Sequence, residues 1–283
     1  MQSNISALQR IILNNYKEFK RICEKYGLRY YAIGGTCIGA VRHQGFVPWD
    51  DDMDVAMPLD DFLEFRNVAP LELSDPYELF DIDEHKHCAF RFLKLINQET
   101  TFIENGCEPY PDRYCGVFLD IMPLCGAPND PNEREKYLNF IMQSWRKNIH
   151  LRFPPDYFKT IKSRAYSLIT IYRHVLMPFY YYTRKVGRIC KKYSFDSSDN
   201  TFFIWRRNPN RMFFLHRDFA DYIDMPFEDT MIRVPVGYDS YLKADFGDYM
   251  TLPPEEERHL VHQAAILDLN RSYKEYIKER NLH

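Results

Sequence analysis

The chain of 283 residues lacks several features that would place it in a familiar class. No run of about eighteen uncharged apolar residues is present, so no membrane-spanning helix is predicted. The first residues are polar, without the apolar segment of a secretory signal. The seven cysteines form no CxxC pair, which favours reduced thiols over a disulfide framework. A net charge of −3 gives no excess of positive charge for nucleic acid. We therefore expect a cytoplasmic protein without a nucleic-acid partner.

A glycine turn is the first feature with chemical meaning. Residues 28–33 are aromatic and apolar and predict a buried strand. Gly34 and Gly35 allow the backbone to approach a ligand closely, because neither has a Cβ atom. Thr36 is expected to cap a helix over residues 37–42, whose free N–H groups would face an anion. Together these elements predict a phosphate-binding cradle.

Four aspartates follow within residues 50–54. On a strand, alternation would place Asp52 and Asp54 on one face. Two neighbouring carboxylates repel each other unless a cation lies between them, and hard oxygen ligands suit Mg²⁺ or Mn²⁺. Asp50 and Asp51 fit a solvated acidic turn. A lone Asp120 interrupts the apolar run 117–122, where an unpaired charge is costly, so we expect it to share the metal.

Three stretches of the sequence resemble one known family. The string GGTCIGAVRHQGFVPWDDDMD at residues 34–54 resembles the LicD family of phosphotransferases, a branch of the nucleotidyltransferase superfamily. GVFLDIMPL at 116–124 is similar to the family segment that supplies a third aspartate. FGDYM followed by LPPEEER is similar to the terminal segment, with Phe246 in place of a tyrosine and Glu257 in place of a lysine. The resemblance covers residues 20–126 and 219–262.

The resemblance implies a fold and a set of site residues. The implied fold is α/β (α+β), a nucleotidyltransferase-like mixed β-sheet flanked by helices. Asp52, Asp54 and Asp120 are implied to hold Mg²⁺ or Mn²⁺ and to catalyse the reaction. The residues implied to bind phosphate or nucleotide are Gly34, Gly35, Thr36, Arg42, Lys94 and His262.

The resemblance also implies a reaction. The donor would be a CDP-linked alcohol, CDP-choline first, with CDP-ribitol and CDP-glycerol as alternatives. The acceptor would be a hydroxyl of a cell-surface glycan or teichoic-acid precursor, and CMP would leave. Two other functions stay open: a nucleotidyltransferase that acts on the α-phosphate of a nucleoside triphosphate and releases pyrophosphate, and a non-catalytic glycan- or lipid-associated protein. Few lysines near the glycine turn weigh against the first, and the retention of all three aspartates weighs against the second.

We expect three units along the chain. Residues 1–128 form the catalytic core, residues 129–215 a mainly helical middle insertion, and residues 216–283 complete the active site. Within the insertion, residues 159–192 combine basic side chains with an apolar and aromatic run. A core helix with a basic rim and a segment lying on anionic lipid both fit this pattern. A polyprenyl-linked acceptor would favour the second, at the inner face of the cell membrane.

Overall fold

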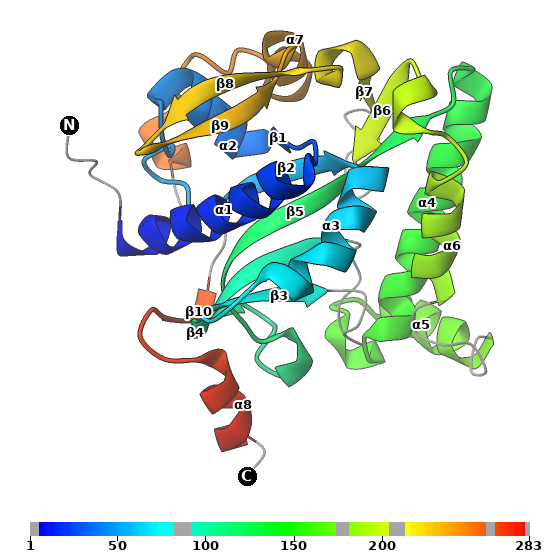
Figure 1. Ribbon diagram of the computed structural model, residues 1–283. Helices are drawn as coiled ribbons and strands as arrows, with labels where there is room; N and C mark the ends of the chain where they lie inside the picture. Colours follow the sequence, from blue (N-terminus) through cyan, green and yellow to red (C-terminus); the bar gives the residue numbers. More distant parts are fainter. Residues whose placement is uncertain (1–5, 82–91, 174–180, 204–212, 259–263, 281–283) are drawn as a thin grey trace.

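A computed structural model describes residues 6–81, 92–173, 181–203, 213–258 and 264–280, which form a mixed β-sheet with helices around it (Figure 1). The strands of this sheet are β1 (Tyr31–Ala32), β2 (Asp54–Pro58), β3 (Tyr77–Asp81), β4 (Leu93–Glu104), β5 (Cys115–Ala127), β6 (Asn200–Phe203), β7 (Phe213–Leu215) and β10 (Ala264–Asp268). A separate hairpin contains β8 (Tyr222–Phe227) and β9 (Thr230–Pro235). The α-helices are α1 (Ala7–Tyr26), α2 (Gly34–Ile38), α3 (Leu59–Glu72), α4 (Pro131–Arg152), α5 (Ile161–Arg173), α6 (Tyr181–Cys190), α7 (Tyr238–Phe246) and α8 (Tyr273–Arg280).

The central strand is β5, and every one of its residues is buried. It runs parallel to β2 and antiparallel to β4 and β6. A nearly continuous apolar run suits this position, because both faces of the strand are covered. β3 and β10 pair with opposite ends of β4. One parallel pair among antiparallel pairs makes the sheet mixed, which confirms the predicted fold class.

α1 and α3 cover one face of this sheet (Figure 1). α1 starts with a capping box, in which the Ser6 hydroxyl accepts from the Gln9 N–H and the Gln9 side chain accepts from the Ser6 N–H. It ends at Gly27, whose φ of 65° suits a residue without a Cβ. Tyr16 and Phe19 are fully buried on its inner side. The helix therefore covers the strands that carry the acidic residues.

The β8–β9 hairpin and α7 close over β1 and α2 (Figure 1). The Phe227 ring packs edge-on against Phe46, with ring centroids 5.1 Å apart. The Glu228 carboxylate accepts a hydrogen bond from the Phe46 N–H at 3.0 Å. These contacts hold the last third of the described chain against the loop that leads to the aspartates.

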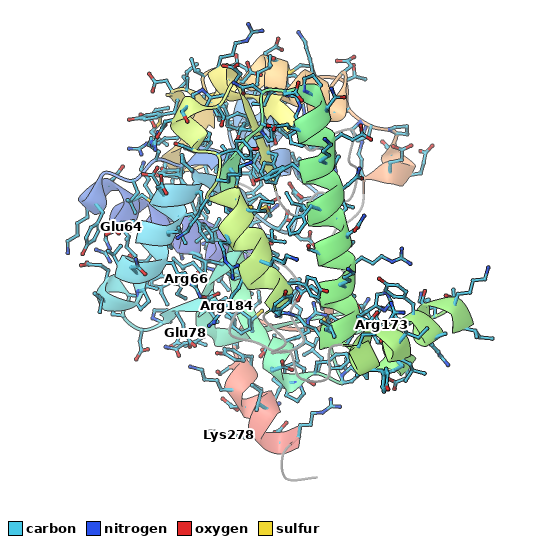
Figure 2. The ribbon with its side chains drawn as sticks, turned by 90° about the vertical axis from the view of Figure 1, so that its right-hand side faces the viewer. Glu64, Arg66, Glu78, Arg173, Arg184 and Lys278 are labelled. Carbon is cyan, nitrogen blue, oxygen red and sulfur yellow. The ribbon has the colours of Figure 1, made fainter. Side chains whose placement is uncertain are left out.

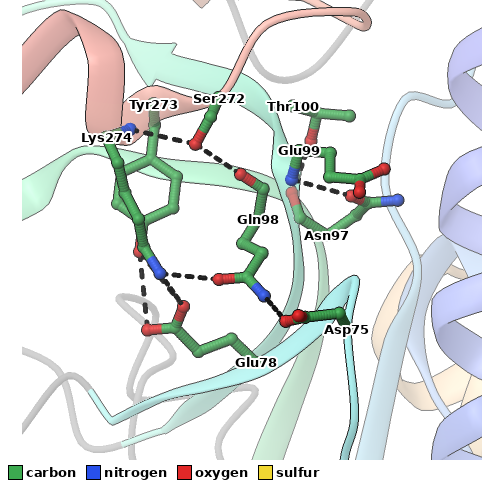
Figure 3. Close-up of polar contacts among 9 residues, drawn as sticks. All are labelled: Asp75, Glu78, Asn97, Gln98, Glu99, Thr100, Ser272, Tyr273 and Lys274. Atoms are coloured by element: carbon green, nitrogen blue, oxygen red, sulfur yellow. Dashed lines mark hydrogen bonds and ion pairs between the residues drawn. The ribbon is translucent and has the colours of Figure 1, made fainter.

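α8 is tied to the far end of the sheet by a polar network (Figure 3). Lys274 Nζ donates to Glu78 and to the side-chain oxygen of Gln98, each at 2.6 Å. The Ser272 hydroxyl donates to the Gln98 carbonyl at 2.6 Å. The C-terminal helix is thus fastened to β3 and β4.

The predicted middle insertion is helical through α4, α5 and α6, and both α5 and α6 pack on α4. After Cys190 the chain returns to the main sheet, where β6 pairs with β5 and β7 pairs with β6. The predicted boundaries of the three units stay a prediction. Across the described ranges, no helix is long and apolar enough to cross a membrane.

Candidate active site

Three charged side chains form a row across the middle of the sheet. Asp54 on β2 is opposite Asp120 on β5, and Asp120 is opposite Lys94 on β4. Paired residues on neighbouring strands point to the same face, so the three side chains lie together. Asp120 is 5% exposed and Lys94 is 6% exposed. The structure therefore brings Asp54 and Asp120 side by side, as the apolar runs around them suggested.

Lys94 neutralises part of this negative charge. Its Nζ lies 3.4 Å from Asp120 Oδ1 and 3.3 Å from Glu104 Oε1. The ammonium also sits over the Phe118 ring, 3.0 Å from the centroid. Burial opposes the charge, but Asp120 and Glu104 more than offset it, so the pKa of Lys94 is raised. The contact with Glu104 was not expected from the sequence.

Asp54 is surrounded by other carboxylates. Its pKa is raised well above the usual range, first because the carboxyl is buried and then because Asp52, Asp120 and Asp50 add negative charge. Lys94 acts in the opposite direction without cancelling the effect. An electrostatic environment of this kind disfavours a bare carboxylate and would favour a bound cation.

Asp52 lies just before the strand, because β2 begins at Asp54. The prediction that Asp52 and Asp54 alternate on one strand is therefore wrong, although their charges remain close enough to interact. The Asp54 N–H donates to the Thr36 hydroxyl at 2.8 Å, where a longer strand would use it for sheet pairing.

Asp50 and Asp51 belong to the acidic cluster as well. One carboxylate oxygen from each of Asp50, Asp51 and Asp52 lies within 4.8 Å of the other two. Asp51 is buried, so the interpretation of a solvated turn is wrong for this residue. The run of consecutive aspartates was the available signal, but it could not show that the loop folds inward over the sheet.

The glycine turn is packed directly against these aspartates. Gly34 has a φ of +57°, and a Cβ on it would lie 3.3 Å from Asp54 Oδ2. A Cβ on Gly35 would lie 2.4 Å from Asp50 Oδ2, so a side chain there would displace the Asp50 carboxylate. The turn and the acidic cluster therefore form one site.

The prediction that Thr36 caps a helix is wrong, because α2 already begins at Gly34. Its buried hydroxyl instead holds the Asp54 backbone, as described above. The Gly34 N–H donates to the Tyr241 hydroxyl at 2.9 Å. Tyr241 comes from α7, about two hundred residues along the chain, and the sequence carried no signal for this contact.

Arg42 lies at the end of a short π-helix, Gly39–His43, that continues α2. Its Nη1 donates to the Tyr249 carbonyl at 2.5 Å, and its Nε donates to His43 Nε2 at 3.0 Å. Burial and the Arg42 charge lower the pKa of His43. Arg42 thus joins the glycine-turn segment to the terminal motif, while His262 lies outside the described residues.

The part of the chain that carries the glycine turn matches a known protein family. Residues 27–114 match a family model described as LicD/FKTN/FKRP, nucleotidyltransferase domain. This match contains the glycine turn and Asp54 and ends before Asp120. This confirms the resemblance inferred from the glycine and aspartate motifs.

Individual known proteins are similar to this chain over different shares of its length. The chain is 27% identical to the lipopolysaccharide cholinephosphotransferase LicD of Haemophilus influenzae, over 92% of this chain and 97% of that protein. It is 37% identical to an uncharacterized protein of Rickettsia typhi over 35% of this chain and 33% of that one. A stretch of 40 residues, 14% of this chain, is 42% identical to 8% of the human ribitol 5-phosphate transferase FKRP.

Proposed function

We propose that this LicD-family chain transfers a phospho-alcohol from a CDP-linked donor to a hydroxyl of a cell-surface glycan or teichoic-acid precursor, with release of CMP. The observation that carries the proposal is the placement of Asp54 beside Asp120, against a glycine turn, in a chain similar along its length to a cholinephosphotransferase. CDP-choline is the first candidate donor, and the similarity to a ribitol 5-phosphate transferase supports CDP-ribitol as the next. CDP-glycerol is the third.

The carboxylate side chains of the site match the ligands that a hard divalent cation prefers. Asp52, Asp54 and Asp120 offer only carboxylate oxygens, and the pKa of Asp54 is raised by burial and then by neighbouring negative charge that Lys94 does not cancel. These three residues would hold Mg²⁺ or Mn²⁺, which would supply neutralisation of the donor's diphosphate. Asp50 and Asp51 adjoin this set and would add to its negative charge.

The transfer step itself involves the two substrates and the side chains and backbone of the site. The acceptor hydroxyl oxygen forms a bond to the phosphorus that bears the alcohol, and the bond from that phosphorus to the CMP oxygen breaks. The hydroxyl proton passes to a carboxylate of the site, and CMP leaves with the electron pair of the broken bond. Gly34, Gly35 and Thr36 would line the phosphate side, and Arg42 would add positive charge there. Phosphoryl transfer depends mainly on such positioning and charge neutralisation.

A donor panel tests the reaction class. Purified protein is incubated with CDP-choline, CDP-ribitol, CDP-glycerol and CTP, with Mg²⁺ or with EDTA, and CMP and pyrophosphate are quantified. We expect Mg²⁺-dependent CMP release from one CDP-alcohol. Pyrophosphate from CTP alone would overturn the proposal in favour of a nucleotidyltransferase. A matched series with a glycan-lipid extract as acceptor covers the case in which turnover requires the acceptor.

Thr36 offers a test of how Asp54 is positioned. Thr36→Val keeps the shape of the buried side chain but removes the acceptor of the Asp54 N–H bond. We expect CMP release to fall by about 10- to 100-fold, the usual effect of losing a group that orients a metal ligand. Thr36→Ser retains the hydroxyl and should keep most of the activity. Equal rates for Thr36→Val and wild type would show that this hydrogen bond does not position Asp54.

A further inference from the structure

The helix α5 is built with its apolar side toward solvent. Ile161, Leu168, Ile169 and Tyr172 are 86%, 59%, 51% and 83% exposed. Their spacing places them on one stripe of the helix. The opposite side is small and polar: Ser167 and Thr170 are buried, and the Ser167 hydroxyl donates to the His150 carbonyl on α4 at 3.1 Å. A solvated helix has the reverse arrangement, so this apolar stripe suits a non-aqueous partner.

The surrounding sequence is strongly basic. Residues 157–195 contain no aspartate or glutamate, whereas the whole chain has a net charge of −3. The lysines and arginines of this segment are Lys159, Lys162, Arg164, Arg173, Arg184, Lys185, Arg188, Lys191 and Lys192. On α5 itself, Lys162, Arg164 and Arg173 are exposed beside the apolar stripe. A partner for this surface must therefore be both negatively charged and able to take up apolar side chains.

The position of α5 leaves it accessible to a flat surface. It extends from the C-terminal end of α4, away from the main sheet, and Arg173 lies near its own end (Figure 2). The view in Figure 1 also places it at the outer margin of the fold. A bilayer could approach this helix without meeting the strands that hold the aspartates.

We propose that α5 lies on the surface of an anionic phospholipid bilayer, with its apolar stripe inserted among the lipids and its basic residues on the headgroups. An amphipathic helix flanked by lysines and arginines binds such a surface through both contributions. A second copy of the chain is a poorer occupant, because two segments of high positive charge would face each other. The proposal is independent of the proposed reaction, and its test measures binding alone.

Co-sedimentation of the full chain with vesicles tests the proposal. The vesicles contain phosphatidylcholine alone or phosphatidylcholine mixed with phosphatidylglycerol. We expect the anionic vesicles to bind at least about tenfold more tightly, with the difference shrinking as salt is raised. The double variant Leu168→Ser/Tyr172→Ser should weaken this binding by about tenfold, because two inserted side chains lose their apolar contact.

Matched variants separate a specific surface from a general effect. Lys162→Glu/Arg164→Glu should also reduce binding by about tenfold or more, through the loss and reversal of charge. Leu71→Ser on α3, where the leucine is 82% exposed, and Lys278→Glu on α8 should bind like wild type. No binding to anionic vesicles, or equal binding by the α5 variants and wild type, would overturn the proposal. A dimer in sedimentation velocity that the Leu168→Ser/Tyr172→Ser variant abolishes would assign the surface to a second copy instead.

Discussion

Replacing Asp54 by asparagine is expected to abolish CMP release and to raise the melting temperature of the metal-free protein. The amide cannot supply the carboxylate needed for the divalent cation, so the rate should fall by about 10³-fold or more. At a pH above the raised pKa it also removes a carboxylate charge that burial, Asp52, Asp120 and Asp50 all oppose. Each kcal/mol of repulsion relieved should raise the melting temperature by about 2 °C or more.

The pH dependence of stability gives a second readout for Asp54. Because its pKa is raised on folding, the folded protein binds this proton more tightly than the unfolded chain does. The metal-free wild type should therefore lose stability as the pH rises from the ordinary carboxyl range through the raised pKa. Asp54→Asn should lose less over the same interval. Thermal melts in EDTA across a pH series measure both proteins.

The matched control is Asp60→Asn, at an exposed position in the first turn of α3. It should leave both activity and the metal-free melting curve near those of wild type. Added Mg²⁺ should stabilise wild type and Asp60→Asn, since binding to the folded state alone raises stability, but not Asp54→Asn. Full activity in Asp54→Asn would remove this residue from the site.

Replacing Lys94 by methionine is expected to destabilise the protein severely. The side chain is buried between Asp120 and Glu104, and its removal leaves Asp120 as a buried carboxylate without its ammonium partner. Breaking a buried ion pair from one side costs about 3–5 kcal/mol. Since methionine fills a similar volume, lost packing contributes little to this cost. Chemical denaturation at pH 7 measures the change in the free energy of unfolding.

A double variant separates charge from packing at Lys94. Lys94→Met/Asp120→Asn removes both members of the pair, and it should regain much of the stability that Lys94→Met loses. Activity should stay absent, because Asp120 is a proposed metal ligand. If Lys94→Met is as stable as wild type, the ion pair with Asp120 contributes nothing to folding. If the double variant shows no recovery, the loss comes from packing.

The residues of the candidate site that were predicted from the sequence each have a local signal. Gly34 and Gly35 lack side chains where the chain must turn, and Asp120 interrupts an apolar run that could only be a buried strand. Strand alternation and the cost of an isolated buried charge then brought Asp54 and Asp120 into one prediction. The mixed sheet was implied by the family resemblance.

The remaining contacts depend on the register between distant segments. Lys94 meets Asp120 because β4 and β5 pair antiparallel in one specific register, and Gly34 meets Tyr241 because α7 folds back over α2. Neither pairing has a local signal. Thr36 was assigned to a cap because its distance from Asp54 in space could not be known.

The middle segment shows a similar limit. Its basic residues and apolar run are plain in the sequence, but periodicity alone fits a core helix as well as a surface helix. The direction of the stripe is decided by Ser167, which faces α4, so that Leu168 and Tyr172 turn outward. Only the packing of α5 on α4 distinguishes a surface helix from a core helix here.

Calorimetric titration of CDP-choline, CDP-ribitol and CDP-glycerol tests the central claim most directly, because donor binding needs no acceptor. Each donor is titrated into wild type and Asp120→Asn, with Mg²⁺ and with EDTA. We predict that one donor binds wild type in Mg²⁺ and at least about tenfold more weakly in EDTA, whereas Asp120→Asn in Mg²⁺ binds it no more tightly than wild type does in EDTA. Equal affinity of that donor in EDTA and in Mg²⁺, or equal affinity of Asp120→Asn and wild type in Mg²⁺, would contradict metal-dependent donor binding at Asp52, Asp54 and Asp120.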